Sequence, residues 1–183
     1  MMRRLPFIRN DRASAAAELA LVTPFLLALM FGAVELGNLF MDEHALQKQV
    51  RNGARFASRL ELHENYSCPS AVFADADATT KIVNVTQNGA VTGSGTPRWT
   101  GYWSRTCSGG GQTVTVAIRC VNKDQIDAGN TGNSGIYTSL GGSTIPVVRV
   151  SGAVQYRSVI ATLVFDAADI CLEAESELPV QGI

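Results

Sequence analysis

Two carboxylates and one amide interrupt a long apolar stretch near the N-terminus. Glu18 stands at its start, and Glu35 and Asn38 lie toward its far end. A carboxylate at bilayer depth costs about 2.5–3.5 kcal/mol on insertion scales, so a simple membrane anchor has no need of either one. Each carboxylate either reaches water at a membrane boundary or meets a partner in an assembly of helices. We favour the assembly role for Glu18 and leave both interpretations open for Glu35.

The other reactive side chains form no recognisable catalytic or metal site. His44 and His63 are 19 positions apart on a predicted helix, which separates them by about 28 Å, so they cannot share a site within one chain. Asp75 and Asp77 form a D-x-D pair. Carboxylates are favourable at a helix start, and this explains the pair more simply than a metal or acid/base site does. The sequence has no G-x-S-x-G, H-E-x-x-H or phosphate-binding loop. We therefore predict no enzymatic activity, no cofactor and no metal.

Four cysteines follow the apolar stretch, and none belongs to a C-x-x-C pair. An even number of cysteines outside the membrane indicates two disulfides in an oxidising compartment. Three pairings are possible, and we expect Cys68 with Cys107 and Cys120 with Cys171. A bond between Cys107 and Cys120 is disfavoured, because a hairpin that turns at Gly109–Gly111 would hold these two residues far apart.

The element that positions Glu18 and Glu35 is a predicted membrane helix. Leu19–Phe40 has 22 residues; as a helix this length reaches about 33 Å, enough to cross a bilayer core. A basic leader precedes the helix, and Asp42 and Glu43 follow it directly. The positive-inside rule therefore places the N-terminus in the cytoplasm and the chain from residue 41 onward outside. The leader arginines are Arg3, Arg4, Arg9 and Arg12.

A proline and two pairs of small residues lie within this helix. Pro24 removes one backbone hydrogen bond and can bend the helix there. Ala28/Gly32 and Ala33/Gly37 have the small-xxx-small spacing that allows helices to approach closely. Ala and Gly are also common in membrane helices, so helix contact and ordinary composition both remain possible explanations.

The helix is predicted to continue to about residue 62 as a stem with two different faces. Apolar residues recur at helical spacing on one face, and basic residues occupy the opposite face. The favoured interpretation is a helix on which the following domain docks, with a solvated basic face. The apolar face comprises Leu39, Leu46, Val50, Gly53, Ala57 and Leu60, and the basic face Lys48, Arg51, Arg55 and Arg59.

The C-terminal residues predict a small α+β head with an antiparallel sheet. Asp75–Asn88 predicts a short helix that ends at Gly89, with a strand as the alternative because the segment is rich in β-branched residues. Alternation of apolar and polar residues predicts strands at Gln112–Val121, Ile145–Tyr156 and Ile170–Leu178. The last strand has an acidic face, which suits an edge strand and, less simply, a docking site for a basic partner. Its acidic residues are Glu173, Glu175 and Glu177.

Two further segments of the head have more than one interpretation. The glycine-rich region from Gly89 to Gly142 contains Trp99, Tyr102 and Trp103. These aromatic side chains either close the end of a small core or contact a sugar or a partner, and the first is the more common arrangement. Arg157–Phe165 is apolar and fits a strand or a short helix.

Ala13–Pro24 reads ASAAAELALVTP, and the apolar run after it leads to Glu35-Leu36-Gly37 and then to Asn52–Arg55. Over about residues 12–60 this pattern resembles the TadE-like family, the minor pilins or pseudopilins of bacterial tight-adherence (Tad) pilus systems. The resemblance implies that a prepilin peptidase cuts between Ala13 and Ser14, which makes Glu18 the fifth mature residue. It also implies that the mature helix packs beside those of other pilins.

Filament packing would give the polar residues of the helix specific roles. The positive α-amine of Ser14 must be neutralised in a low-dielectric core, and Glu18 of the same or a neighbouring subunit is placed to do so. Glu35 and Asn38 would then form a second polar contact between stems.

The sequence therefore predicts an α+β protein with a long N-terminal transmembrane helix, a pilin-like stem, and a small head with an antiparallel β-sheet. Its expected parts are a basic leader (1–13), a transmembrane helix (14–40), an amphipathic stem helix (41–66) and an extracytoplasmic head (67–183).

The expected function is that of a minor pilin or pseudopilin, a structural subunit that helps pilus assembly or initiation. It would be anchored by one span in the bacterial inner membrane with a periplasmic head, with that membrane, other pilins and the prepilin peptidase as partners. The alternative is a membrane-anchored periplasmic binding module or adhesin that is not processed as a pilin. A net charge of −1 gives no argument for nucleic acid as a partner.

Overall fold

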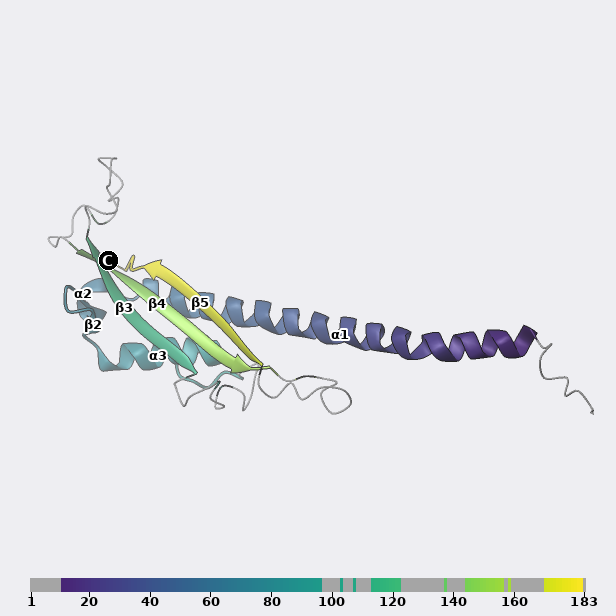
Figure 1. Ribbon diagram of the computed structural model, residues 1–183. Coiled ribbons are helices and arrows are strands. Elements are labelled where there is room, and N and C mark those ends of the chain that lie inside the picture. Colours follow the sequence, from purple (N-terminus) through teal and green to yellow (C-terminus); the bar gives the residue numbers. More distant parts are fainter. Residues whose placement is uncertain are drawn as a thin grey trace, which may run out of the picture.

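The computed structural model describes residues 11–96, 103, 107, 113–122, 137, 144–156, 158 and 170–182, with only the backbone of residues 11–13. One long helix runs the length of the molecule, and the head, meaning the described residues after this helix, is built on its C-terminal part (Figure 1). The prediction of an α+β chain with a long N-terminal helix is confirmed. The elements are α1 (Asp11–Ser58), α2 (Leu62–Asn65), β1 (Tyr66–Ser67), β2 (Val72–Phe73), α3 (Ala76–Asn88), β3 (Val114–Asn122), β4 (Thr144–Gln155) and β5 (Cys171–Pro179).

Helix α1 has 48 residues and continues without a break through Pro24. It ends at Ser58, a few residues before the predicted end at about residue 62. The Ser58 carbonyl accepts hydrogen bonds from the backbone N–H groups of Gln181, at 2.6 Å, and Gly182, at 3.2 Å. The C-terminal segment of the chain thus satisfies a carbonyl that would otherwise lack a partner at the helix end.

Helix α3 has the boundaries that its sequence signals predict. The Asp75 carboxylate accepts a hydrogen bond from the Asp77 N–H at 2.9 Å and caps the N-terminus. This hydrogen bond is the main reason why the pKa of Asp75 lies below its usual value. Gly89 adopts φ 73°, the left-handed conformation that glycine accepts readily at a helix end. The helical interpretation of this segment is confirmed over the strand.

Three antiparallel strands form the main sheet in the order β3-β4-β5, with a separate two-stranded β1-β2 ladder. Each strand begins and ends within two residues of its predicted position. Among the described strands β5 pairs with β4 alone and is therefore an edge, as its acidic alternation predicted. The apolar side of each strand faces the core, where Val114, Val150 and Leu172 are buried.

The head has two layers, because α1 and α3 lie together on one face of the sheet (Figure 1). The C-terminal part of α1 supplies Leu46, Val50, Ala54 and Ala57 to the core, and all four are fully buried. The apolar face predicted for the stem is therefore the surface on which the head is built. Lys48, Arg51, Arg55 and Arg59 are exposed, as predicted.

Several predictions concern segments outside the described residues. They are the roles of Trp99 and Tyr102, the hairpin at Gly109–Gly111 and the conformation of Arg157–Phe165. Trp103 is described, with 7% of its surface exposed within the core cluster, which agrees with a core role for this one aromatic residue.

Candidate functional site

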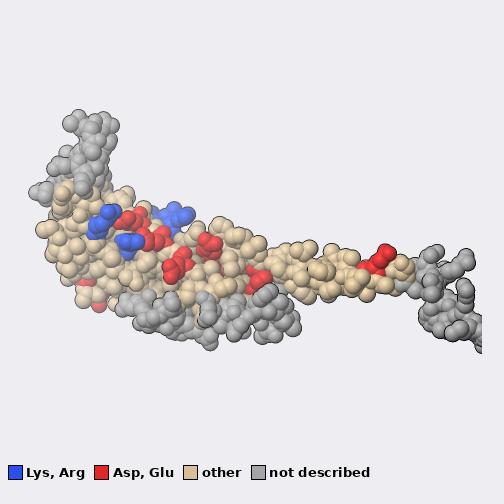
Figure 2. Space-filling model, in the orientation of Figure 1, with Lys and Arg blue, Asp and Glu red and all other residues tan. Residues whose placement is uncertain are grey.

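Residues 14–34 of α1, called here the bare half, project beyond the head and remain exposed, apart from a half-buried Thr23. In Figure 2 this rod is free of charged side chains except for one acidic group near its N-terminal end. By length and composition α1 is long and apolar enough to cross a membrane, and none of its most apolar segment is buried. Because its own apolar side chains point outward on every side, the bare half requires apolar surroundings on every side. Leu21, Phe25 and Leu29 are each more than 70% exposed.

Glu18 is the single charged residue of the bare half. Its side chain is exposed, and no residue in the described part of the chain makes a hydrogen bond or ion pair with it. Ser14 lies four positions earlier, on the same side of the helix. The pairing of the Glu18 carboxylate with an α-amine on Ser14 stays a prediction, because that amine exists only after leader cleavage.

The backbone of the bare half is continuous, and its small residues are accessible. Pro24 lies inside the helix, and the neighbouring Thr23 hydroxyl donates a hydrogen bond to the Leu19 carbonyl at 2.6 Å. A Cβ atom built on Gly32 or Gly37 would meet nothing within 4 Å. Both glycines therefore leave room for the close approach of another helix, the geometry that small-xxx-small pairs permit.

Glu35 lies where the head first contacts the helix. The Tyr156 hydroxyl donates a hydrogen bond to Glu35 Oε1 at 2.8 Å and approaches the Glu35 carbonyl at 3.2 Å, across 121 positions of sequence. Burial raises the pKa of Tyr156 above its usual value, and the hydrogen bond to Glu35 raises it further. Glu35 is thus engaged by its own chain, and Asn38 is half-buried one turn later. Their predicted contact between stems stays a prediction.

The covered half of α1, residues 46–57, approaches α3 and the sheet closely. A Cβ atom on Gly53 would clash with Thr86 Oγ1, and one on Gly152 would lie 3.0 Å from Val50 Cγ2. The Tyr66 hydroxyl donates to the Ala57 carbonyl at 2.5 Å. Helical spacing predicted Gly53 on the apolar face, but it did not predict that the missing side chain permits this helix crossing.

Two disulfides hold the head together, as the cysteine count predicted, but the expected pairing is wrong. Cys68 is bonded to Cys120, and Cys107 to Cys171. β3 and β5 lie on opposite sides of β4, so Cys120 of β3 and Cys171 of β5 are not neighbours. The disfavoured bond between Cys107 and Cys120 is indeed not formed.

The face of the sheet that points away from α1 carries charged side chains in mutual contact. Arg149 pairs with Glu175, and an Arg119 guanidinium nitrogen lies 2.8 Å from Glu177 Oε1. Figure 2 shows both signs of charge gathered over this face of the head. Ion pairs between exposed groups contribute little to stability, so this surface resembles an ordinary solvated face. Within the described ranges, no three His, Cys, Asp or Glu side chains are grouped to hold a metal ion.

The TadE-like protein family model matches residues 13–55. This segment contains Ser14, Glu18, the whole bare half, Glu35 and most of the covered half, and the match confirms the resemblance deduced from the same residues. No curated protein and no solved structure matches the chain significantly.

Proposed function

We propose that this chain, which carries a TadE-like segment at residues 13–55, is a minor pilin of a Tad pilus. A TadE-like segment implies a protein associated with that pilus system. In the proposal the chain is a structural subunit without enzymatic activity. It is anchored in the bacterial inner membrane by the bare half, with the N-terminus in the cytoplasm and the disulfide-bonded head in the periplasm.

The observation that carries the proposal is the bare half itself, with Glu18 near its start. A helix that is apolar on all sides and extends from its own head needs lipid or other helices around it. A plain anchor of this length has no need of a carboxylate, whereas a packed bundle of stems has a use for one. The two disulfides support an oxidising compartment for the head.

In this proposal a prepilin peptidase removes the leader between Ala13 and Ser14. The new α-amine of Ser14 enters an apolar environment, where an unpaired charge is costly, and the Glu18 carboxylate neutralises it. The peptidase and the other pilins of the filament are the proposed partners, and the subunit initiates, caps or adapts the filament.

The first experiment is N-terminal sequencing of the protein from cells that contain the peptidase. A processed pilin begins at Ser14, and an intact N-terminus would instead support the membrane-anchored binding module.

The second experiment compares Glu18→Gln with Glu43→Gln, a change on the same helix beyond the bare half. Removing one partner of a buried charge pair is costly, so we expect Glu18→Gln to reduce recovery in the pilus fraction roughly tenfold or more. Glu43→Gln should leave recovery unchanged. Equal recovery of Glu18→Gln and the wild type would contradict the role of Glu18, and thermal unfolding of the head serves as the folding control.

A further inference from the structure

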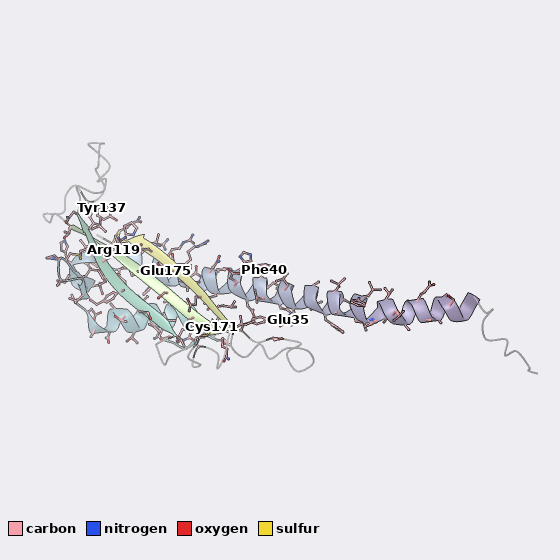
Figure 3. All side chains as sticks on the ribbon, in the orientation of Figure 1. Glu35, Phe40, Arg119, Tyr137, Cys171 and Glu175 are labelled. Atoms are coloured by element: carbon pink, nitrogen blue, oxygen red, sulfur yellow. A yellow bond between two sulfur atoms is a disulfide. The ribbon has the colours of Figure 1, made fainter. Side chains whose placement is uncertain are left out.

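The head reaches down the helix to the point where the bare half ends. Tyr156 follows β4 directly, is 4% exposed, and its hydroxyl donates to Glu35 Oε1 at 2.8 Å. Figure 3 shows Glu35 on α1 near Cys171, at the end of the sheet closest to the bare half. The contact therefore marks a definite position along α1. On its C-terminal side the head covers one side of the helix, and on its N-terminal side the helix is exposed.

With Ser14 as the first residue of the mature chain, as in the proposed function, the length of the bare half agrees with a membrane surface at this level. Residues 14–34 are 21 residues, which in a helix extend about 31 Å, close to the thickness of the hydrocarbon core. A span that begins at Ser14 therefore ends where Glu35 begins. At this depth a carboxylate benefits from a hydrogen-bond donor that the protein itself supplies, and tyrosine is enriched at the membrane interface.

Exposed apolar side chains surround this level on both the helix and the head. Leu36, Phe40 and Met41 are 53%, 50% and 63% exposed on α1. Ile170 is 41% exposed, and its carbonyl accepts a hydrogen bond from the Tyr156 N–H at 2.8 Å, so it lies beside the same contact. Along the helix axis, Met41 stands about 9 Å beyond Glu35, which is comparable with the depth of a headgroup layer.

We propose that the outer membrane-water boundary crosses the molecule at the Glu35–Tyr156 hydrogen bond. Leu36, Phe40, Met41 and Ile170 then form an apolar collar that lies among the lipid headgroups, continuous with the apolar span. Tyr156 is the positioning residue, because its hydrogen bond to Glu35 joins the head to α1 at this depth and fixes the head at one height on the membrane. The inference rests on the membrane-anchored state in the proposed function and adds to it the lower end of the head as a lipid-facing surface.

The experiment measures the depth of single spin labels on the full chain in dilute phospholipid vesicles. The described cysteines are all disulfide-bonded, so one introduced cysteine can be labelled selectively. Phe40→Cys tests the collar, Leu29→Cys is the reference for the span, and Val72→Cys is the reference for an exposed residue at the far end of the head. Each label is exposed to oxygen, which concentrates in lipid, and to a nickel chelate, which stays in water.

We expect the label at position 40 to give a ratio of oxygen accessibility to nickel accessibility that lies between the ratios at positions 29 and 72. Nickel accessibility equal to that at position 72 would overturn the proposal, since the collar would then stand in water. Low accessibility to both reagents would also overturn it, in favour of a neighbouring protein that covers the collar. A label at position 29 without the lipid signature would instead contradict the membrane span of the proposed function.

The role of Tyr156 is tested with a matched pair of variants. Each removes one tyrosine hydroxyl of the head that donates a hydrogen bond to α1. Without the hydroxyl, the Glu35 carboxylate loses the donor that ties the head to it, so Tyr156→Phe should raise the nickel accessibility at position 40 by roughly twofold to tenfold, the effect of one net hydrogen bond. Tyr66→Phe removes the hydroxyl that donates to the Ala57 carbonyl and should leave this accessibility unchanged. The positioning role is contradicted if Tyr156→Phe leaves it unchanged too, or if both variants raise it equally.

Discussion

Two regions of helix α1 differ in how their apolar side chains are distributed around the helix axis. The bare half, residues 14–34, is apolar on every side and exposed except at Thr23, whereas the covered half, residues 46–57, is apolar on one side and basic on the other. A helix with one apolar face is satisfied by one layer of protein, here α3 and the sheet. A helix that is apolar all round must be enclosed, and the head encloses none of it.

The difference shows which part of the chain specifies the fold and which part specifies its surroundings. Mutations in the covered half should change the free energy of unfolding of the head. Mutations in the bare half should leave that free energy unchanged and act on membrane insertion or assembly. The same substitution made in both halves therefore tests the comparison directly.

The largest difference is expected between Leu46→Ala and Leu29→Ala. Leu46 is fully buried in the core, while Leu29 is 71% exposed in the bare half. Truncation of a buried leucine costs about 2–5 kcal/mol through lost burial and the cavity that remains. Leu46→Ala should lower the free energy of unfolding of the head by this amount, and Leu29→Ala should not change it, as measured by denaturant unfolding in detergent. A similar loss in both variants would show that the head also depends on the bare half.

A smaller difference is expected between Gly53→Ala and Gly32→Ala. The added methyl group at Gly53 meets Thr86 Oγ1, which itself donates to the Ile82 carbonyl at 2.8 Å, whereas the methyl group at Gly32 meets nothing. Overpacking costs about 1–3 kcal/mol, and the better helix propensity of alanine offsets up to 1 kcal/mol of it. Gly53→Ala should therefore destabilise the head by up to about 2 kcal/mol.

The Gly32→Ala variant makes the comparison sharper, because its expected effect lies outside the head. Denaturant unfolding of the head should match the wild type, whereas helix association in the membrane should weaken if Gly32 lies in a close contact between helices. A clear change in head unfolding from Gly32→Ala would contradict the separation of the two halves.

The sequence predicted features that depend on local patterns. Asp75 and Gly89 marked the ends of α3 because capping depends on a few neighbouring residues. The alternation in β3, β4 and β5 predicted both their positions and their buried faces, and helical spacing predicted the covered face of α1. The bare half and Glu18 were equally visible, since a long apolar run with one charge needs no tertiary information.

The features that the sequence did not predict depend on how distant segments meet. The disulfide pairing follows from the order of strands in the sheet, which the spacing of Cys68, Cys107, Cys120 and Cys171 does not contain. The contact of Tyr156 with Glu35 joins residues 121 positions apart. Tyr156 appeared in the strand pattern only as one more residue on the buried face. A tyrosine at the end of an otherwise valine-rich face, with a hydroxyl that needs a partner, was the available signal.

The smallest effect is expected on the basic side of the covered half, where Arg51→Gln provides the test. Arg51 is exposed, and no residue in the described part of the chain forms an ion pair with it. Surface substitutions away from specific contacts usually change stability by no more than about 0.5 kcal/mol. Denaturant unfolding of Arg51→Gln should therefore stay within that range of the wild type, five residues from the costly change at Leu46.

The Arg51→Gln result decides whether the covered half has one structural side or two. If the isolated protein loses as much stability as it does with Gly53→Ala, the basic side contributes to the head, and the division into an apolar docking face and a solvated face is wrong. If stability is unchanged but pilus recovery falls, the basic side contacts another subunit, because the arginine then matters only in the assembly. An unchanged result in both measurements leaves the bare half and the adjoining collar as the parts of α1 through which this subunit meets its surroundings.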